Sequence, residues 1–270
     1  MPDDLPDDEV GDQAGDQVEI VPDGPAGCFV VRVDGREQSY VDLGDPTRLA
    51  FDYVRRIGDV LDAVAPPGEP IRLVHVGGAG LTIPRYVAAT RPRSAQVVFE
   101  PAESLTALVR AELPLPRQSG IKVRAVDGVS GVAALRDDYA DVMVVDAFDH
   151  GRVPIGLLEA EHLAQIGRVL HPDGCYVLNL VDQAPFALAR DVVAGLREVF
   201  STLMVSAEPA TLRGRRPGNV LVTAGRGGVP LADLRRRAAS SPAPYQVLDD
   251  RLVSDTLGGG RALRGPQPAP

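Results

Sequence analysis

From residue 71 onward, short apolar runs alternate with amphipathic stretches along the chain. Each apolar run has five to eight residues, the length of a buried β-strand. Between the early runs lie stretches whose apolar positions recur at helical spacing, including 102–112, 156–170 and 184–200. This alternation predicts right-handed βαβ crossovers and a largely parallel sheet with helices on both faces. The predicted strands are 71–76, 96–100, 121–125, 141–146, 174–181, 202–207 and 219–223.

No helical pattern separates the last two predicted strands, 202–207 and 219–223. A loop rich in Gly, Arg and Pro joins them, so we expect them to pair as an antiparallel hairpin. The expected fold class is therefore α/β, with a doubly wound, seven-stranded and mostly parallel sheet. A sheet that ends in such a hairpin resembles that of the class I S-adenosylmethionine-dependent methyltransferases and their relatives.

A smaller unit precedes this sheet. An Asp-Gly turn pair at 34–35 lies between strand-like runs at 28–33 and 38–43, which predicts a β-hairpin. An Asp-Pro pair at 45–46 then supplies an N-cap and a first helical residue, and apolar positions follow at helical spacing. The sequence therefore predicts one hairpin and one helix over residues 26–68.

Charge is unevenly distributed along the chain. The net charge is −9, but nine of the 37 acidic residues lie within residues 1–25, which contain no Lys or Arg. The remaining 28 acidic residues balance 28 basic ones. A Pro- and Asp-rich segment with few large apolar side chains cannot offset its ordering entropy, so we expect residues 1–25 to be a disordered acidic tail. A tail that shields a site for a cationic ligand is the alternative.

Composition also excludes several classes of protein. The body is neutral, aromatic residues are only 4% and Trp is absent, so no basic stripe with stacking platforms is present to bind nucleic acid. No apolar stretch approaches the roughly 20 residues that cross a bilayer. With no basic leader at the N-terminus and only two cysteines, we expect a cytoplasmic protein with no membrane partner. The four histidines show no zinc-ligand spacing with these cysteines, so we expect no metal site.

Domain boundaries follow from these patterns. We expect the main domain over residues 69–224, after the hairpin and helix. Residues 225–270 show only weak periodicity and end in a Gly- and Pro-rich stretch, which predicts a partly disordered C-terminal extension.

Candidate chemistry begins where the first strand of the main sheet ends. Gly77, Gly78 and Gly80 form a glycine-rich turn before a helical stretch, where backbone can approach a ligand closely. Glu100 ends the second strand, and a carboxylate there can accept two hydrogen bonds from a ribose diol. Asp127-Gly128 follows the third strand, and Asp127 can accept from an adenine amine. Together these residues outline a nucleoside pocket.

A nicotinamide cofactor fits the turn less well. The dinucleotide motif G-x-G-x-x-G needs a third glycine, and Ile83 occupies that position. Hydride transfer is therefore disfavoured.

Two further carboxylates, Asp146 and Asp149, follow the fourth strand. Both would face the crevice in which the reacting end of a ligand lies. Paired acids can hold a cationic amine and accept its proton, and their proximity raises the pKa of one toward that of a usable base. One turn-capping Asp and one solvated Asp is the alternative.

These motifs, in this order, resemble those of the polyamine aminopropyltransferases, the spermidine synthase family. The resemblance covers residues 28–224. It rests on Val33-Asp34-Gly35 with Gln38, Gly77-Gly78-Ala79-Gly80 with Arg85, Glu100, Asp127-Gly128, Asp146-Ala147-Phe148-Asp149 and Leu170-His171-Pro172-Asp173-Gly174.

The resemblance implies a role for each motif. The glycine turn, Glu100, Asp127 and Gly128 would bind the nucleoside, and Asp146 would be the base that deprotonates the attacking amine. Asp149 and Gln38 would bind that amine. The reaction would move an aminopropyl group from decarboxylated S-adenosylmethionine to an amine such as putrescine, with no tightly bound cofactor. The family commonly forms dimers, so a homodimer is expected.

The chain also departs from the family pattern. Gly80 stands where the family usually has an Asp that holds the aminopropyl amine, and Asn179 stands where a Gln is common. His150 replaces a proline after the second acid. The family's Tyr-His-Glu stretch is absent, and residues 50–53 read Ala-Phe-Asp-Tyr instead. Two alternatives therefore stay open, a methyltransferase that uses intact S-adenosylmethionine and a member without catalytic activity.

Overall fold

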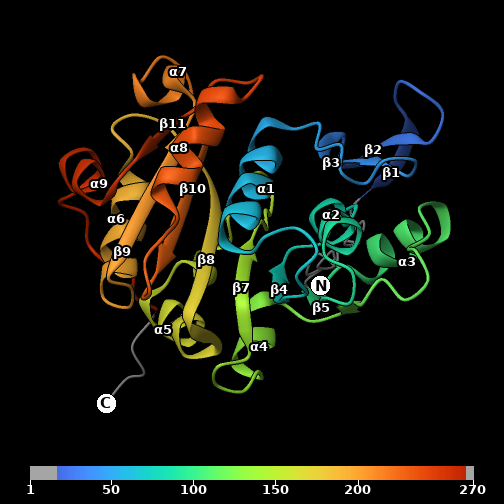
Figure 1. Cartoon of the computed structure of the whole chain (residues 1–270), viewed down its shortest axis with the longest axis horizontal. Coiled ribbons are helices and arrows are strands. Elements are labelled where there is room, and N and C mark those ends of the chain that lie inside the picture. The colour runs from blue at the N-terminus through green and yellow to red at the C-terminus, as the bar shows by residue number, and fades with distance from the viewer. Residues whose placement is uncertain (1–16, 266–270) are drawn as a thin grey trace, which may run out of the picture.

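A computed structural model describes residues 17–265, and its centre is one eight-stranded β-sheet (Figure 1). Its strands are β4 (Arg72–Val76), β5 (Ala95–Phe99), β6 (Ile121–Arg124), β7 (Ala140–Val145), β8 (Leu170–Asp182), β9 (Thr202–Ala207), β10 (Gly218–Gly225) and β11 (Gln246–Leu248). They lie in the order β11-β9-β10-β8-β7-β4-β5-β6. The strands from β6 to β8 pair in parallel, and β9 and β10 form the predicted antiparallel hairpin.

Helices cover both faces of this sheet, because side chains on both sides of its strands are apolar. In β7, Met143 and Val145 face one helical layer, whereas Val142 and Val144 face the other. The first layer consists of α4 (Gly128–Ala133), α5 (Ala160–Val169), α6 (Ala187–Arg197) and α9 (Asp250–Leu257). The second consists of α1 (Asp52–Val64), α2 (Thr82–Thr90) and α8 (Leu231–Ser240). The short helices η1 (Ile155–Leu157) and α7 (Pro209–Leu212) lie in loops.

The eighth strand, β11, was not predicted. It has three residues and pairs antiparallel with the edge strand β9. So short a segment shows no measurable alternation of apolar and polar residues, and only the neighbouring strand makes it extended. The prediction of seven strands is therefore one short, while the predicted fold class is confirmed.

A second, three-stranded antiparallel sheet precedes the main one. It contains β1 (Val18–Pro22), β2 (Cys28–Val33) and β3 (Arg36–Asp42), and β2 and β3 are the predicted hairpin. β1 falls within the segment expected to be disordered, so that prediction is wrong for these residues. Val18 and Ile20 pack in a cluster with apolar residues of α3 (Glu103–Glu112), a long-range contact that local composition does not reveal. The rest of the predicted tail, residues 1–16, lies outside the described residues.

The C-terminal region also differs from expectation. Residues 231–257 form α8, β11 and α9 in place of a partly disordered extension. Leu234, Val253 and Leu257 are buried against the main sheet, and the Leu263 carbonyl accepts a hydrogen bond from the Ala160 N–H at 2.8 Å. Burial of a few widely spaced apolar residues therefore orders this region, although its periodicity is weak. Residues 266–270 lie outside the described residues.

The helix predicted after Asp45 begins later than expected. The Asp45 carboxylate accepts a hydrogen bond from the Thr47 N–H at 3.0 Å, but it caps only a short turn. The chain is then extended at Phe51, and α1 starts at Asp52.

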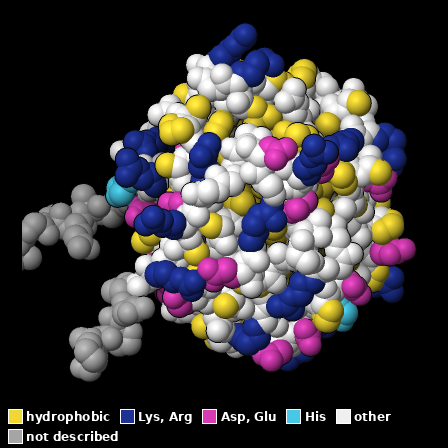
Figure 2. All heavy atoms as spheres, turned by 90° about the vertical axis from the view of Figure 1, so that its left-hand side faces the viewer, with side chains coloured by type: hydrophobic (Ala, Val, Ile, Leu, Met, Phe, Trp, Pro, Cys, Tyr) yellow, Lys and Arg dark blue, Asp and Glu magenta, His cyan; other side chains and the backbone are white. Residues whose placement is uncertain are grey.

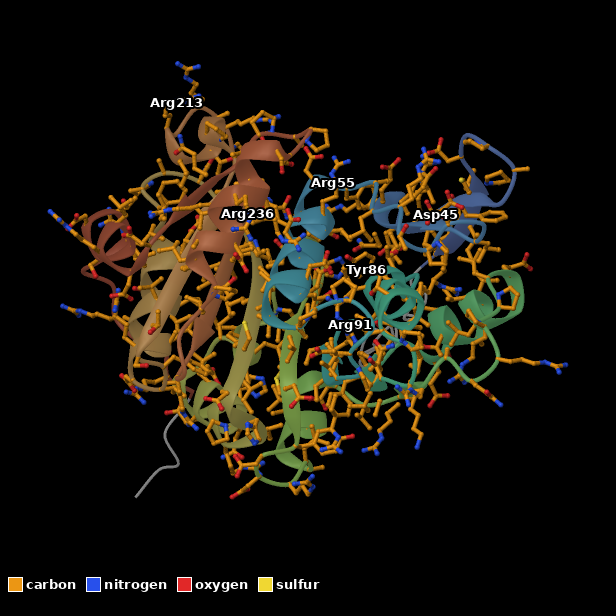
Figure 3. All side chains as sticks on the ribbon, in the orientation of Figure 1. Asp45, Arg55, Tyr86, Arg91, Arg213 and Arg236 are labelled. Carbon is orange, nitrogen blue, oxygen red and sulfur yellow. The ribbon has the colours of Figure 1, made fainter. Side chains whose placement is uncertain are left out.

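The second helical layer is joined by a charged group centred on Asp62. The Tyr86 hydroxyl and Arg91 both donate to Asp62 Oδ1 at 2.8 Å, and Arg237 donates to Oδ2 at 3.2 Å. These residues come from α1, α2, the residue after α2, and α8, and Figure 3 labels Tyr86 and Arg91 beside α1. The interaction fixes α1, which carries Tyr53 of the site described below.

The outer surface of the C-terminal half is mixed in charge. Figure 2 shows basic and acidic side chains interspersed over the face formed by this half. No helix within residues 17–265 is long and apolar enough to cross a membrane.

Arg85 connects the glycine-rich turn to the end of α3. It is 4% exposed, and it donates to the carbonyls of Gly80, Leu113 and Pro114. We expect Arg85→Met to lower the free energy of unfolding by about 2–4 kcal/mol, because the carbonyls of the buried residues Gly80 and Leu113 lose their donor. Urea denaturation measures this loss.

Arg110→Met is the matched control, because Arg110 is exposed on α3. Its expected effect is within about 0.5 kcal/mol. Equal unfolding midpoints for the two variants would contradict the role assigned to Arg85.

Candidate functional site

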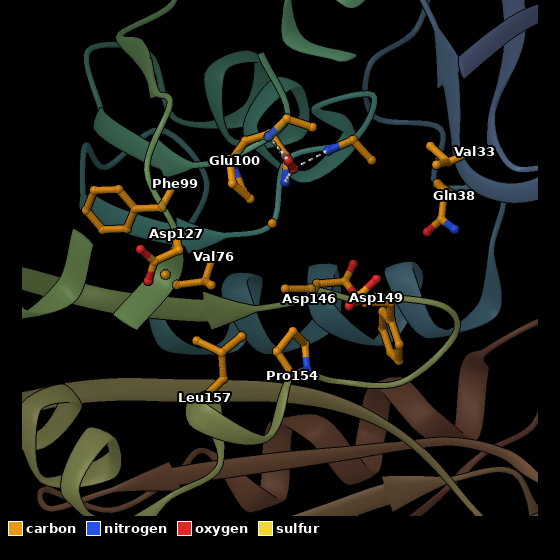
Figure 4. Close-up of a pocket in the computed structure, with 18 of the residues that line it drawn as sticks. Val33, Gln38, Val76, Phe99, Glu100, Asp127, Asp146, Asp149, Pro154 and Leu157 are labelled. Carbon is orange, nitrogen blue, oxygen red and sulfur yellow. Dashed lines mark hydrogen bonds between the residues drawn. The ribbon is translucent and has the colours of Figure 1, made fainter. Parts of the chain in front are cut away.

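The carboxyl ends of β4, β5 and β7 surround a cavity of about 440 Å³ (Figure 4). β4 and β7 are neighbours in the sheet, but the chain continues from them in opposite directions, to β5 and to β8. Open α/β sheets bind ligands at such a reversal of strand order. The volume is in the range of small-molecule sites. Its lining combines apolar side chains with five carboxylates, those of Asp34, Glu100, Asp127, Asp146 and Asp149.

Gly77 lets the ends of β4 and β7 touch. Its φ is +89°, and a Cβ at this position would lie 2.3 Å from the Asp146 carbonyl oxygen. The Asp146 N–H donates to the Val76 carbonyl at 2.9 Å, which joins the two strand ends. Only glycine fits both the conformation and the contact.

Glu100 lies inside the glycine-rich turn and holds it in shape. Its Oε2 accepts the N–H groups of Gly78 at 2.8 Å and Ala79 at 3.4 Å, and its Oε1 accepts that of Ala102 at 3.1 Å (Figure 4). A carboxylate has about four lone-pair sites, so about one remains for a ligand. The predicted ribose acid therefore lines the cavity and also organises the turn.

Every backbone N–H from residue 77 to residue 81 has a partner within the protein. Besides the two that Glu100 accepts, Gly77 donates to the Phe99 carbonyl, Gly80 to Ser39 Oγ and Leu81 to the Gly78 carbonyl. The turn therefore offers no unpaired N–H group between these residues to a ligand anion.

Asp127 and Gly128 lie at the other end of the cavity. Asp127 caps α4 by accepting the Ser130 N–H at 2.9 Å, and this hydrogen bond lowers the pKa of Asp127. A Cβ at Gly128 would lie 2.3 Å from a methyl of Val76, so Gly128 packs tightly beside the cavity. Both predicted residues line the cavity.

Gly80 does not line the main cavity. It is buried under the three-stranded sheet, where a Cβ would lie 2.8 Å from Ser39 Cβ and from a Val41 methyl. Ser39 and Val41 therefore fill the space beside the position at which the resembled family has its amine-binding Asp. Gly80 is not among the residues that line this cavity, so the geometry gives no support to a contact between Gly80 and a nucleoside, which stays a prediction.

Asp146 is partly buried where the cavity meets a smaller recess beside Tyr53. Its Oδ1 accepts a hydrogen bond from Asn179 Nδ2 at 2.9 Å. Burial raises the pKa of Asp146 from its ordinary value of 3.8 to about 6, while hydrogen bonds from Asn179 and the Tyr53 side chain oppose the rise. This carboxylate is ionised at neutral pH but binds a proton readily.

Asp149 and Gln38 lie at the mouth of the cavity. The Asp149 side chain is 73% exposed, and His150 Nε2 lies 3.6 Å from its Oδ1. Gln38 is partly buried on β3, opposite Asp146 and Asp149 in Figure 4. The structure therefore brings the two predicted amine-binding residues to the same end of the cavity as Asp146, with Gln38 facing the two acids.

Three residues near Asp146 were not predicted as site residues. Tyr53 comes from α1, Asn179 from β8 and Asn219 from β10. A signal for Asn179 is present in the sequence, because it interrupts an otherwise apolar strand that is buried on both faces. Tyr53 and Asn219 give no such signal, because only the tertiary fold brings Tyr53 to the recess beside Asp146 and Asn219 to Asn179.

Within residues 17–265, no group of three or more His, Cys, Asp and Glu side chains is placed to hold a metal ion. Cys28 and Cys175 are both buried and free.

Comparison with solved structures identifies the architecture. A probable spermidine synthase from Corynebacterium glutamicum superposes with a TM-score of 0.86 and 26% identity, covering 94% of this chain and 95% of that one. The chain is spermidine synthase-like in structure. A spermidine synthase in complex with the transition state analogue AdoDATO has a TM-score of 0.58 and 14% identity, covering 90% of this chain and 81% of that one, which shows the shared fold.

A curated human protein, eEF1A lysine and N-terminal methyltransferase, is 29% identical over 147 residues. The match covers 50% of this chain and 21% of the human protein, so the chain spans only about a fifth of that relative. No protein-family model matches the chain. This spermidine synthase-like chain thus also has a methyltransferase relative, in line with its methyltransferase-like sheet.

The packing around Gly80 gives a testable prediction. We expect Gly80→Ala to lower the free energy of unfolding by about 1–3 kcal/mol, because the new methyl group overlaps Ser39 and Val41. Gly156→Ala is the control, since a Cβ there meets only a Val129 methyl at 3.6 Å. Thermal unfolding compares the two variants. Equal melting temperatures would show that Ser39 and Val41 move to accommodate the new methyl group.

The raised pKa of Asp146 predicts a pH dependence of stability. Because folding raises the pKa from 3.8 to about 6, the folded state favours the protonated carboxyl and loses stability as pH rises between these values. Asp146→Asn removes the titrating group, so we expect this variant to exceed wild type in unfolding free energy by about 1–3 kcal/mol at pH 7.5. The difference should shrink at pH 4. Urea titrations at both pH values test this, and a difference independent of pH would contradict it.

Proposed function

We propose that this chain transfers an aminopropyl group from decarboxylated S-adenosylmethionine to an amine such as putrescine. The observation that carries the proposal is Asp146, a partly buried carboxylate with a pKa of about 6 beside an acid-lined cavity. Its chemistry suits a general base that works at neutral pH. The likeness to a probable spermidine synthase supports the same reaction.

In the proposed reaction, the nucleoside lies between Glu100 and Asp127. The acceptor amine, with a pKa of about 10, arrives protonated and gives its proton to Asp146. The free amine nitrogen then attacks the aminopropyl carbon next to sulfur, so a C–N bond forms as the C–S bond breaks. The positive sulfonium becomes a neutral thioether, methylthioadenosine. Asp149 and Gln38 would bind the far end of the acceptor and orient it for in-line attack.

Two features of the cavity favour the decarboxylated donor over intact S-adenosylmethionine. The backbone N–H groups of residues 77–81 are already hydrogen bonded within the protein, so they offer nothing to a methionine carboxylate. Five carboxylates also line the cavity, against one arginine, Arg36, and one histidine, His150. A ligand with only cationic groups is favoured by this charge distribution, and an added carboxylate is disfavoured.

Methyl transfer from S-adenosylmethionine is the second candidate. Gly80 supplies no carboxylate to bind an aminopropyl amine, and Ser39 and Val41 pack so closely against it that a carboxylate side chain would not fit there. The curated human relative is a methyltransferase. A protein that binds the nucleoside without turnover is a third candidate.

Calorimetric titration separates these candidates. Purified protein is titrated with decarboxylated S-adenosylmethionine, intact S-adenosylmethionine and methylthioadenosine, each with and without putrescine. We expect tighter binding of the decarboxylated donor, strengthened by the amine. Preference for the intact donor would favour methyl transfer, and absence of binding by all three would overturn both enzymatic functions.

Asp146→Asn tests the proposed base. We expect kcat for aminopropyl transfer to fall by about 10²–10⁴-fold while the affinity for methylthioadenosine stays within twofold, because the nucleoside subsite is unchanged. In wild type, kcat should rise with pH through about 6, because the base must be ionised. Unchanged kcat in the variant would exclude Asp146 as the base.

A further inference from the structure

A chain of side-chain amides runs from Asp146 away from the cavity. Asn179 Nδ2 donates to Asp146 Oδ1 at 2.9 Å, and Asn219 Nδ2 donates to Asn179 Oδ1 at 3.1 Å. Asp146 directly follows β7, and Asn179 and Asn219 lie on β8 and β10, the next two strands of the sheet. Asn179 pairs with Leu221 in the ladder, and Asn219 pairs with Val181, so the two amides are diagonal neighbours on one face of the sheet.

The orientation of the Asn179 amide decides whether Asp146 faces a hydrogen-bond donor or a hydrogen-bond acceptor. The two ends of an amide have nearly the same shape, but the NH₂ end only donates and the oxygen only accepts. An ionised carboxylate needs the donor end. If the oxygen faced Asp146 instead, the hydrogen bond could form only with a protonated carboxyl. Asn179 is fully buried, so no water competes to set its direction.

We propose that Asn219 is a positioning residue that, by donating to Asn179 Oδ1, fixes the NH₂ end of Asn179 toward Asp146. Asn219 touches neither the cavity lining nor Asp146, and it acts through Asn179. Its effect on catalysis rests on the proposed role of Asp146 as a base. The effect of Asn219 on the proton affinity of Asp146 does not depend on that proposed role.

Helix α1 supports this arrangement from the other side. Arg56, which is 3% exposed, donates to the Asn219 carbonyl from both Nη atoms at 3.2 Å and to the Ser206 carbonyl at 2.7 Å. Tyr53, three residues earlier on the same helix face, lines the recess beside Asp146 and lowers the pKa of that carboxyl. One helix therefore fixes both ends of the amide chain. Because Arg56 binds the Asn219 backbone, a change of the Asn219 side chain leaves this support in place.

Other titratable groups act on Asp146 as well. Tyr53 faces it from α1, and its hydrogen bond lowers the pKa of Asp146, as Asn179 does, whereas burial raises it. The remaining titratable and charged groups around the cavity are Asp34, Arg36, Glu100, Asp127, Asp149 and His150. All of these stay unchanged in Asn219→Ala and Asn219→Gln, so a change in titration in these two variants reports the amide chain. Asn219→Asp adds a carboxylate, whose charge also raises the pKa of Asp146.

The test is a titration of the Asp146 carboxyl carbon by NMR in the full chain, assigned by its loss in Asp146→Asn. Asn219→Ala leaves the Asn179 amide free to turn, so we expect the pKa of Asp146 to rise by about one unit. Asn219→Asp keeps the side-chain shape but only accepts, which turns the oxygen of Asn179 toward Asp146 and should raise the pKa at least as far. Asn219→Gln keeps the donor and should restore part of the wild-type value.

Ser206→Ala is the matched control, because Ser206 lies opposite Leu221 on the adjacent strand and keeps its carbonyl for Arg56. It should leave the pKa of Asp146 unchanged. If the pKa is the same in wild type, Asn219→Ala and Asn219→Asp, the proposal is overturned. If Asn219→Ala does not fold, Asn219→Leu decides, because leucine is close to asparagine in size, carries no charge and cannot donate a hydrogen bond.

The same variants separate this proposal from the proposed function. If aminopropyl transfer is detected, the pH of half-maximal kcat should move up with the NMR value in Asn219→Ala, with the KM for the donor unchanged. If no transfer is detected with any donor, the proposed function fails, but the NMR titration still tests the role of Asn219.

Discussion

The site depends on the close contact between the end of β4 and the end of β7. At Gly77 the backbone turns with a positive φ directly against the Asp146 carbonyl, where a Cβ would lie 2.3 Å away. This contact sets the position of Asp146 relative to the glycine-rich turn, and the turn is itself shaped by Glu100. The proposed nucleoside subsite and the proposed base therefore share one backbone junction, so a shift of either strand end would move both.

The junction places a carboxylate where it is costly to keep ionised. Burial raises the pKa of Asp146, and the hydrogen bonds from Asn179 and Tyr53 offset only part of that cost. A fully solvated Asp would be a weaker base, and a fully desolvated one would stay protonated at neutral pH. The partial compensation leaves a proton affinity between these limits. The same burial that makes the ionised Asp146 carboxylate costly for the stability of the fold therefore makes it a stronger base.

The parts of the molecule that the sequence predicts are those with a repeated local signal. The strands from β4 to β10 are mostly apolar on both faces, apart from the edge strand β6, in which apolar and charged residues alternate. Their apolar runs therefore stand out, and the acids at their carboxyl ends follow from the order of the strands. β1 and β11 lack such a signal, since each becomes a strand only by pairing with a neighbour. Tyr53 and Asn219 lie far from Asp146 in sequence, so only the fold brings them close. Gly80 belongs to a glycine-rich motif, but its environment depends on Ser39 and Val41 of another sheet.

That last contact bears on what the cavity can bind. Ser39 and Val41 of the three-stranded sheet pack against the glycine-rich turn. They occupy the space that a further carboxylate, placed to bind the aminopropyl amine, would need. Of the five acids that line the cavity, Asp146 and Asp149 lie on the β7 side, where we propose that the acceptor binds. A cationic donor tail would then be held by the overall negative field of the cavity and not by a dedicated ion pair. Such a field is less selective for the position of a charge than a paired carboxylate, so discrimination between donors would rest on the sign of their charge.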